Sequence, residues 1–471
     1  MSVPDAVLRL VIQYIPLKHR LCSCCLVSRR MHAAAVAVQD LELRPFSPQR
    51  AVSGMVWLSH YGKLLTSLKI EEFGLVQQQL PCTNLLELRM LFGCTVQLGP
   101  GGLHMGVLHC CTKLTLLELR CNIFDAHAGR IDCLPSLVHL QHLVVFPANM
   151  PIPLMLSSAT LPSLKHLTYF EARDLSIDHL TQFSGLTSLR ELHLDAYSDT
   201  AVGPSSVPGL AFPASLTYLE LISDVEAGLL SLVPPGLQEL RVWGGVEGPA
   251  DGPDSLFACM AGLQRLSRLS ALCLVPVPGL HWPPPGPAYS ALTANTNLVQ
   301  LDLLGTNCPQ GVWQYVFPAA HKLPHLAYLE LQDADGVDAS APAPVWSAVD
   351  INRLVTCCPS LSDIVNLSLQ PGLHVSALQQ LTALTRMEVF HNANDHAVFS
   401  ESVRGLAAIS QLKVLDVKQV SLAFKLASLL PLTSLTALTD LRVYWYPHDD
   451  HSWPPPALSL WYNTAQVNHS R

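Results

Sequence analysis

The sequence predicts an α/β solenoid, in which successive repeats each add one strand to a curved parallel β-sheet. Short helices and loops are expected on the convex side, with a small helical module in front. Three observations predict this fold class. A leucine motif recurs along most of the chain. The 471 residues exceed what an ordinary single globular core holds. Apolar residues make up 49% and charged residues 14%, so most side chains are expected to line a core.

The first element has helical periodicity and reads "VPDAVLRLVIQYIPLKHRL" over residues 3–21. Its apolar residues form one stripe on a helix: Val7, Leu8, Val11, Ile12 and Ile15. Pro4 and Asp5 suit the first turn of that helix, and Pro16 ends it. We place this helical module at residues 1–40, followed by a transition segment or N-terminal cap at residues 41–64.

The leucine repeat fills residues 65–445. Its skeleton is L-x-x-L-x-x-L-x-L, as in "LTSLRELHL" from Leu186 and "LTALTDLRV" from Leu435. The first apolar residue of the final L-x-L pair falls at positions 68, 88, 117, 143, 167, 192, 219, 240, 272, 301, 329, 367, 387, 415 and 441. The mean spacing is (441 − 68)/14, or about 27 residues, within the range of leucine-rich repeats. Since L-x-L has a period of two, each of about 15 repeats is expected to supply one short strand with both leucines buried.

Other segments interrupt or end the repeat. The spacing between positions 329 and 367 is 38 residues (367 − 329), and we interpret residues 332–346 in this gap as an inserted loop. Its acidic side chains are either simply solvated or part of a binding site. Asp254 or Ser255 is predicted to cap a short convex helix. Residues 446–471 show no repeat and are predicted to form a C-terminal cap or tail.

Three of the 14 cysteines keep a fixed position in the repeat. Cys82, Cys111 and Cys358 each lie three residues before the first leucine of a strand motif. A small thiol at a constant position in a repeat is predicted to be buried and structural. The adjacent pairs at 110–111 and 357–358 suit a reducing compartment rather than a disulfide scaffold.

The residues that flank each L-x-L pair are expected to line the concave face, the usual partner surface of such solenoids. The candidate substrate-binding residues on this face are Glu191, His193, Asp195, Tyr218, Glu220, Arg241, Trp243, Tyr328 and Glu330. Aromatic and charged side chains in alternation are typical of protein interfaces, although an ordinary solvated sheet would look similar. The acid-leaning middle of the face would suit a partner with a basic patch.

Signals for catalysis and cofactors are weak. The sequence contains no G-x-G-x-x-G motif after a strand, no P-loop, no H-E-x-x-H and no G-x-S-x-G. The C-x-x-C at 22–25 is followed by no second Cys or His pair at zinc spacing, and neighbouring residues such as the "HDDH" at 448–451 rarely converge on one metal. We therefore expect no metal and no cofactor. The net charge of −8 argues against nucleic acid, and no apolar run is long enough to span a membrane. We expect a non-enzymatic protein in the cytoplasm, with the nucleus as a second possibility.

The N-terminal segment resembles the F-box, whose pattern is roughly L-P-x-E-L-L-x-x-I-L-S-Y-L-P, then L-x-x-L, then V-C-x-R-W. The matching positions are Pro4, Leu8, Ile12, Tyr14, Pro16, Leu17, Val27, Arg29 and Arg30, with Val7 as a conservative change. Ala6 replaces the acidic residue of the pattern, and Ser28 and Met31 replace the Cys and the Trp. An F-box followed by leucine-rich repeats is the architecture of the F-box/leucine-rich-repeat family.

This resemblance implies a substrate-receptor subunit of a cullin-based ubiquitin ligase. The residues implied to bind the Skp-type adaptor are Pro4, Val7, Leu8, Ile12, Leu17 and Val27. The repeats would hold a protein substrate, and a separate enzyme would transfer ubiquitin. The alternative is a non-enzymatic leucine-rich-repeat scaffold, for example a cytoskeletal or axonemal one, whose N-terminal helices only cap the solenoid.

Overall fold

A computed structural model of the chain describes the repeat region with gaps. The described residues are 40–43, 48–71, 74–76, 82–91, 94–97, 108, 110–120, 122–124, 130–131, 134–146, 155–156, 160–197, 201–223, 225–243, 246–247, 262–274, 286–303, 311–331, 346–369, 375–391, 396–420 and 426–445. Residues 1–39 of the predicted helical module lie outside the described residues, as do the predicted C-terminal cap and the predicted helix cap at Asp254 or Ser255.

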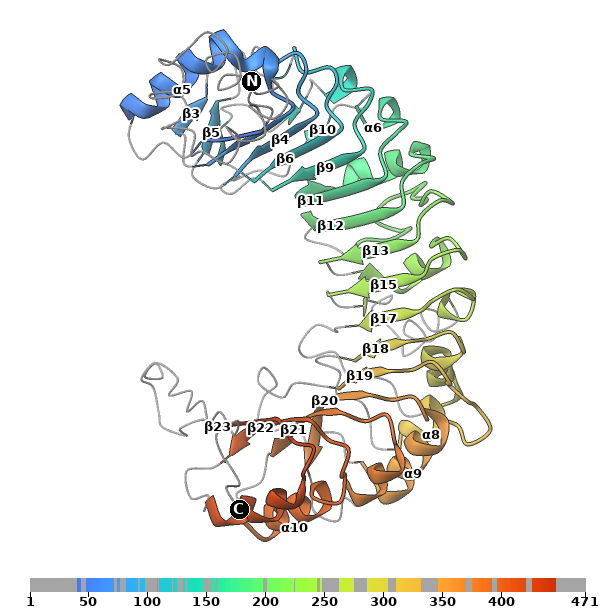
Figure 1. Cartoon of the computed structure of the whole chain (residues 1–471). Helices are drawn as coiled ribbons and strands as arrows, with labels where there is room; N and C mark the ends of the chain where they lie inside the picture. Colours follow the sequence, from blue (N-terminus) through green and yellow to red (C-terminus); the bar gives the residue numbers. More distant parts are fainter. Residues whose placement is uncertain are drawn as a thin grey trace, which may run out of the picture. The chain divides into compact units, whose positions relative to one another are not determined.

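The chain divides into two compact units, and each contributes consecutive parallel strands to a main sheet (Figure 1). The first unit comprises Met1–Asp199 with Val207–Leu216, and the second Thr200–Ser206 with Thr217–Arg471. The strands of the first unit are β1 (Asp40–Leu43), β2 (Ser67–Ile70), β4 (Glu87–Met90), β6 (Leu116–Leu119), β9 (His142–Val145), β11 (Tyr169–Ser176) and β12 (Glu191–Tyr197). Those of the second are β13 (Tyr218–Leu221), β15 (Glu239–Val242), β17 (Ala271–Leu274), β18 (Gln300–Asp302), β19 (Tyr328–Glu330), β20 (Asp363–Leu369), β21 (Arg386–His391), β22 (Val414–Val420) and β23 (Asp440–Trp445).

The predicted L-x-L leucines determine how these strands pair. In the first unit Leu41, Leu68, Leu88 and Leu117 are successive register partners, and all four are buried. Equivalent leucines of the second unit pair in the same way from β13 onwards. Since no single repeat can bury its leucines alone, stacking the strands is what removes this apolar surface from water. The fold is a leucine-rich-repeat solenoid, as the sequence predicted.

In two repeats, the predicted position of the strand motif was wrong by three residues. Position 167 was assigned to the strand pair, but Phe170 is the residue that aligns with Leu143 and Leu192. Position 367 was assigned likewise, but Ile364 aligns with Leu329 and Met387. The reason is physical, because a buried residue every third position precedes each strand and makes neighbouring triplets look alike.

The parallel ladder also begins one strand before the predicted repeat region. Strand β1 lies within the segment assigned to the module boundary and the transition, and it pairs with β2 over its full length. The rest of that segment contains α5 (Pro48–Tyr61) and the 3₁₀ turn η2 (Gly62–Leu64). The transition segment is therefore itself a repeat with a helical connection.

In the described part of the chain, both α-helices and 3₁₀ helices form connections between the strands. The other α-helices are α6 (Thr160–Ser163), α8 (Trp313–Val316), α9 (Ala348–Cys357) and α10 (His396–Leu406). The other 3₁₀ helices are η3 (Leu134–Ser136), η4 (Ile177–Gly185), η5 (Ala227–Ser231), η6 (Pro287–Thr293), η8 (Val375–Gln380) and η9 (Leu426–Ser434). Short accessory strands follow several main strands: β3 (Gly74–Val76), β5 (Cys94–Gln97), β7 (Asn122–Phe124), β8 (Arg130–Ile131), β10 (Met155–Leu156), β14 (Val225–Glu226) and β16 (Val246–Glu247).

The repeated cysteines occupy the turn that precedes each strand. Cys82, Cys111 and Cys358 are fully buried free thiols, which confirms the burial predicted from their spacing. The carbonyl of each accepts a hydrogen bond from the backbone N–H three residues later, for example 3.1 Å to Leu85. Leu137 occupies the same turn position before β9, so an apolar residue replaces the thiol where the repeat lacks cysteine.

The long gap between β19 and β20 is partly helical. Helix α9 begins with a capping box, in which the Ser347 hydroxyl accepts from the Asp350 backbone N–H and the Asp350 carboxylate accepts from the Ser347 N–H. Trp346, assigned to the end of the inserted loop, is buried instead and stacks on Trp313 with ring centroids 4.0 Å apart. Residues 332–345 of the predicted insertion lie outside the described residues.

Candidate partner-binding face

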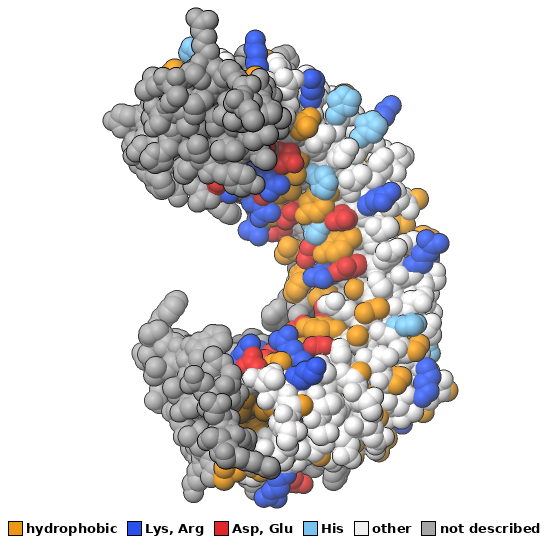
Figure 2. All heavy atoms as spheres, in the orientation of Figure 1, with side chains coloured by type: hydrophobic (Ala, Val, Ile, Leu, Met, Phe, Trp, Pro, Cys, Tyr) orange, Lys and Arg blue, Asp and Glu red, His pale blue; other side chains and the backbone are white. Residues whose placement is uncertain are grey.

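The side chains that alternate with the buried leucines form what we call the open face of each main sheet. On a strand, successive side chains point to opposite sides, so these residues point away from the core. Figure 2 shows charged side chains of both signs among hydrophobic ones along the strands of each unit. Because parallel strands are in register, equivalent positions line up as rows across neighbouring repeats.

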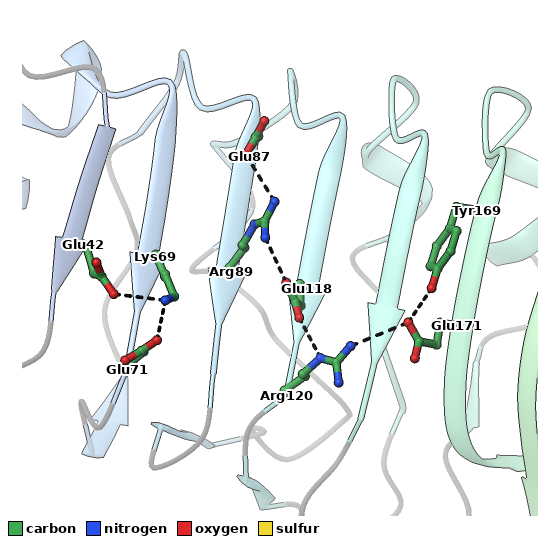
Figure 3. Close-up of polar contacts among 9 residues, drawn as sticks. All are labelled: Glu42, Lys69, Glu71, Glu87, Arg89, Glu118, Arg120, Tyr169 and Glu171. Atoms are coloured by element: carbon green, nitrogen blue, oxygen red, sulfur yellow. Dashed lines mark hydrogen bonds and ion pairs between the residues drawn. The ribbon is translucent and has the colours of Figure 1, made fainter. Parts of the chain in front are cut away.

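In the first unit this row is a chain of ion pairs (Figure 3). The Lys69 Nζ lies 3.0 Å from a Glu42 carboxylate oxygen and 2.6 Å from one of Glu71. The carboxylates raise the pKa of Lys69, with the hydrogen bond to Glu71 contributing most. The lysine therefore stays charged between one acid on the neighbouring strand β1 and one that directly follows its own strand.

The next strands continue the alternation. Arg89 lies 3.8 Å from both Glu87 and Glu118, while the Arg120 Nε donates to Glu118 over 2.6 Å. Arg120 also lies 3.7 Å from a carboxylate oxygen of Glu171. That oxygen accepts a 2.7 Å hydrogen bond from the Tyr169 hydroxyl. Each acid in this row thus has a basic partner within two strands of its own in the sheet order.

Aromatic side chains lie beside these ion pairs. The ring of Phe146 has the Arg120 guanidinium 4.5 Å and the Arg173 guanidinium 5.1 Å from its centroid. His142 and His193 pack against either side of Tyr169, with ring centroids 5.5 Å and 5.0 Å from it. Such stacked rings hold one another in fixed orientations on the face.

The second unit has a different cluster at its first strands. The Trp243 Nε1–H donates to Glu220 over 2.6 Å, and the Tyr218 hydroxyl donates to the same carboxylate over 3.2 Å. Trp243 remains exposed. Arg241 pairs with Glu239 at 2.6 Å, and its guanidinium lies 5.9 Å from the Tyr218 ring centroid. Two aromatic rings and a carboxylate are thereby held together.

On β18 and β19, two acids lie opposite each other, and the only side chains that donate hydrogen bonds to them among the described residues are neutral. Asp302 and Glu330 are register partners on β18 and β19. Asp302 accepts from the Gln300 amide over 2.8 Å, and Glu330 accepts from the Tyr328 hydroxyl over 2.6 Å. Burial raises the pKa of Asp302 to about 6, and the negative charge of Glu330 adds to that effect.

The last strands of the second unit return to ion pairs. Asp416 is buried, with carboxylate oxygens 3.8 Å from Arg386 and 3.8 Å from Arg442. Burial raises its pKa, while Arg442 acts in the opposite direction. Glu388 lies 2.6 Å from the Lys418 ammonium. Charges at this end of the face therefore neutralise one another across strands.

The predicted binding residues lie on the open face, in two groups. Glu191, His193 and Asp195 lie on β12 of the first unit, where Asp195 is 3.4 Å from Arg173. The others belong to the second unit. Tyr218 and Glu220 lie on β13, and Arg241 lies on β15 with Trp243 directly after it. Tyr328 and Glu330 lie on β19. The adaptor-binding candidates lie outside the described residues: Pro4, Val7, Leu8, Ile12, Leu17 and Val27.

Sequence reasoning did not single out the ion-pair row of the first unit. Reading the middle residue of each L-x-L pair from the first strand onward gives Glu42, Lys69, Arg89 and Glu118, a run of charged residues that the sequence already contains. A recurring Tyr-x-Glu pair is a second signal of this kind. It occurs on β11, β13 and β19, and each tyrosine hydroxyl donates to the glutamate two residues later.

Neither a metal site nor a membrane span is found in the described part of the chain. There, no three His, Cys, Asp or Glu side chains converge to hold an ion. Within the same residues, every helix is too short or too polar to cross a bilayer. The "HDDH" stretch lies outside them.

Comparison with known proteins gives only distant structural likeness. No family model matches the chain, and no curated protein matches it. A solved internalin from Listeria monocytogenes str. 4b F2365 is 13% identical, with a TM-score of 0.33, over 84% of this chain and 89% of that one. A complex of TLR13 with the single-stranded RNA ssRNA13 gives 16% identity and a TM-score of 0.40 over 92% of this chain. The aligned part spans 52% of the TLR13 chain, about half its length.

Proposed function

We propose that this chain is a non-catalytic protein-binding subunit that holds a partner on the open face of its leucine-rich repeats. The observation that carries this proposal is the cluster of Tyr218, Glu220 and Trp243. Here an exposed indole and a half-buried phenol are held by hydrogen bonds to one carboxylate. Aromatic anchors of fixed orientation lose little entropy on binding, which is why they dominate protein interfaces.

We further propose that the partner is a substrate for ubiquitination and that the N-terminal segment recruits the ligase. This step is supported by the F-box resemblance of residues 3–31 and by the order of that segment and the repeats. A subunit of this kind needs no reacting groups, because it acts by raising the local concentration of substrate lysines near a separate conjugating enzyme.

Co-purification with a Skp-type adaptor tests the ligase proposal. Full-length chain is expected to retain the purified adaptor, whereas the Pro4→Ala/Leu8→Ala/Ile12→Ala variant is not. Trp243→Ala is the matched control, because it alters the open face and is expected to retain the adaptor fully. If neither the wild type nor the triple variant binds the adaptor, the ligase proposal is wrong.

The second candidate function is that of a repeat scaffold without a ligase. The regular pairing of charges along the first unit favours this candidate, because it resembles a solvated, self-satisfied surface. A scaffold would bind its partner through the open face and would show no adaptor affinity. The same co-purification therefore separates the two candidates.

A further inference from the structure

The open face of the second unit has a stretch of strands on which acids outnumber bases. It covers β13 to β19 and carries four acids, Glu220, Glu239, Asp302 and Glu330, against one base, Arg241. Arg241 is already paired with Glu239. Within the described part of the chain, neither Asp302 nor Glu330 has a cationic side chain at ion-pair distance.

The contrast with other strands makes this stretch informative. In the first unit, Lys69, Arg89 and Arg120 neutralise the acids beside them. On the last strands of the second unit, Lys418 and Arg386 do the same for Glu388 and Asp416. The chain therefore places bases next to acids on strands before and after this stretch, but not beside Asp302 and Glu330.

From this contrast we infer that the open face of β13 to β19 docks an extended, basic segment of the partner protein. The inference rests on the proposed function, since it names the chemistry of the partner that the repeats hold. Asp302 and Glu330 are register partners on adjacent strands, and adjacent strands lie about 5 Å apart in a sheet. A guanidinium presents a fork of donors that can bridge two such groups, so the segment's first anchor is an arginine.

The second anchor position follows from the spacing of strands. Glu220 on β13 lies three strands from Asp302 on β18, which corresponds to about 14 Å. An extended chain advances about 3.3 Å per residue, so a second basic residue about four positions away reaches Glu220. There the rings of Tyr218 and Trp243 flank the carboxylate and offer the π-faces that cations favour.

Burial strengthens the argument from charge. Asp302 is only 5% exposed, and one of its carboxylate oxygens has no hydrogen-bond donor among the described residues. An unsatisfied carboxylate at a buried position costs stability, and an incoming guanidinium would satisfy it. Tyr328, which donates to Glu330, orients that second carboxylate.

The test is a binding titration of full-length chain with a fluorescent probe peptide. The probe is about 12 residues of Gly and Ser with two arginines about four positions apart. The test variant is Asp302→Asn/Glu330→Gln, which keeps side-chain shape. The control variant is Glu42→Gln/Glu71→Gln, which removes the same amount of charge from the face of the first unit.

The expected result is a roughly tenfold loss of probe affinity for Asp302→Asn/Glu330→Gln and less than about twofold for the control. Equal affinity of both variants would overturn the inference, and so would equal binding of a probe with glutamates in place of the arginines. Preferential binding of single-stranded RNA over the probe would also contradict it. Adaptor co-purification with the same protein distinguishes failure of this inference from failure of the proposed ligase function. Adaptor binding does not depend on Asp302 or Glu330.

Discussion

Asp302 and Glu330 lie opposite each other on adjacent parallel strands, and each accepts a hydrogen bond from the residue two positions earlier on its own strand. Two carboxylates in register repel each other, and Arg241, the base that acts on Asp302, is engaged with Glu239. This arrangement lowers stability, as is common where a surface is kept ready for a ligand.

Asp302→Asn is therefore expected to stabilise the chain at high pH. The groups that face Asp302 are Glu330, Glu239, Arg241 and the buried Cys273, and the pKa of Asp302 is raised to about 6. An acid whose pKa is higher in the folded state binds extra protons there, so stability falls as the pH rises from about 4 to about 6. The variant should gain about 1 to 3 kcal/mol at pH 8 and nothing at pH 4.

Chemical denaturation at both pH values measures that difference. Glu42→Gln is the control on the ion-paired part of the face and should not gain stability at pH 8. If Asp302→Asn is less stable than the wild type at pH 8, the carboxylate has a stabilising partner and our description of its surroundings is wrong.

Arg120 is expected to be the most important base in the row of the first unit. It contacts Glu118 and Glu171 and stacks over Phe146, whereas Arg89 makes two longer ion pairs. Arg120→Met should lower the free energy of unfolding by about 1 kcal/mol, and Arg89→Met by only a few tenths, about 0.3 kcal/mol. Denaturation at low and high salt measures the loss of unfolding free energy for each substitution. Equal losses for the two substitutions would contradict this prediction.

Asn366 allows a bulge in β20, where one extra residue separates Ile364 from Leu367 relative to β21. Its φ is 60°, in the left-handed region that asparagine and glycine tolerate best. Asn366→Ala should cost about 1 to 2 kcal/mol in unfolding free energy, and Asn366→Gly less. Thermal unfolding that ranks glycine below alanine would show that the backbone is not the cause.

Glu226 links two segments of the second unit through its carboxylate. Burial raises its pKa, but hydrogen bonds from Ser205 and Ser206 outweigh burial and hold the pKa below its usual range. Its contribution to stability is therefore present at neutral pH and lost as the pH falls through the folded-state pKa. Glu226→Gln should cost about 1 kcal/mol at pH 7 and less at pH 3, and unfolding curves at both values test this.

The buried cysteines should be chemically inert. Burial raises the pKa of Cys82 to about 11 and that of Cys111 to about 12, so almost no thiolate forms at neutral pH. Cys110 is less buried. Alkylation of native protein followed by mass spectrometry should label Cys110 before its neighbour Cys111. Rapid labelling of Cys82 or Cys111 in folded protein would contradict their buried position.

The repeat and its strands could be predicted from the sequence because L-x-L pairs recur with one strand each. The frame could not always be predicted. Leu167 and Phe170 are both buried at a three-residue spacing, and only cross-strand register distinguishes them. The residues of the open face could be predicted, including Glu220 and Glu330. Which of these side chains pair with one another could not. Whether an acid meets a base depends on which residue of the next strand lies beside it.

Isothermal titration of a purified Skp-type adaptor into the full chain is the most direct test of the central claim, that residues 3–31 connect a partner-binding repeat to a ubiquitin ligase. The account predicts a saturable 1:1 interaction that Pro4→Ala/Leu8→Ala/Ile12→Ala abolishes and Asp302→Asn/Glu330→Gln leaves unchanged. Absence of heat and of complex with the folded wild-type chain would contradict it.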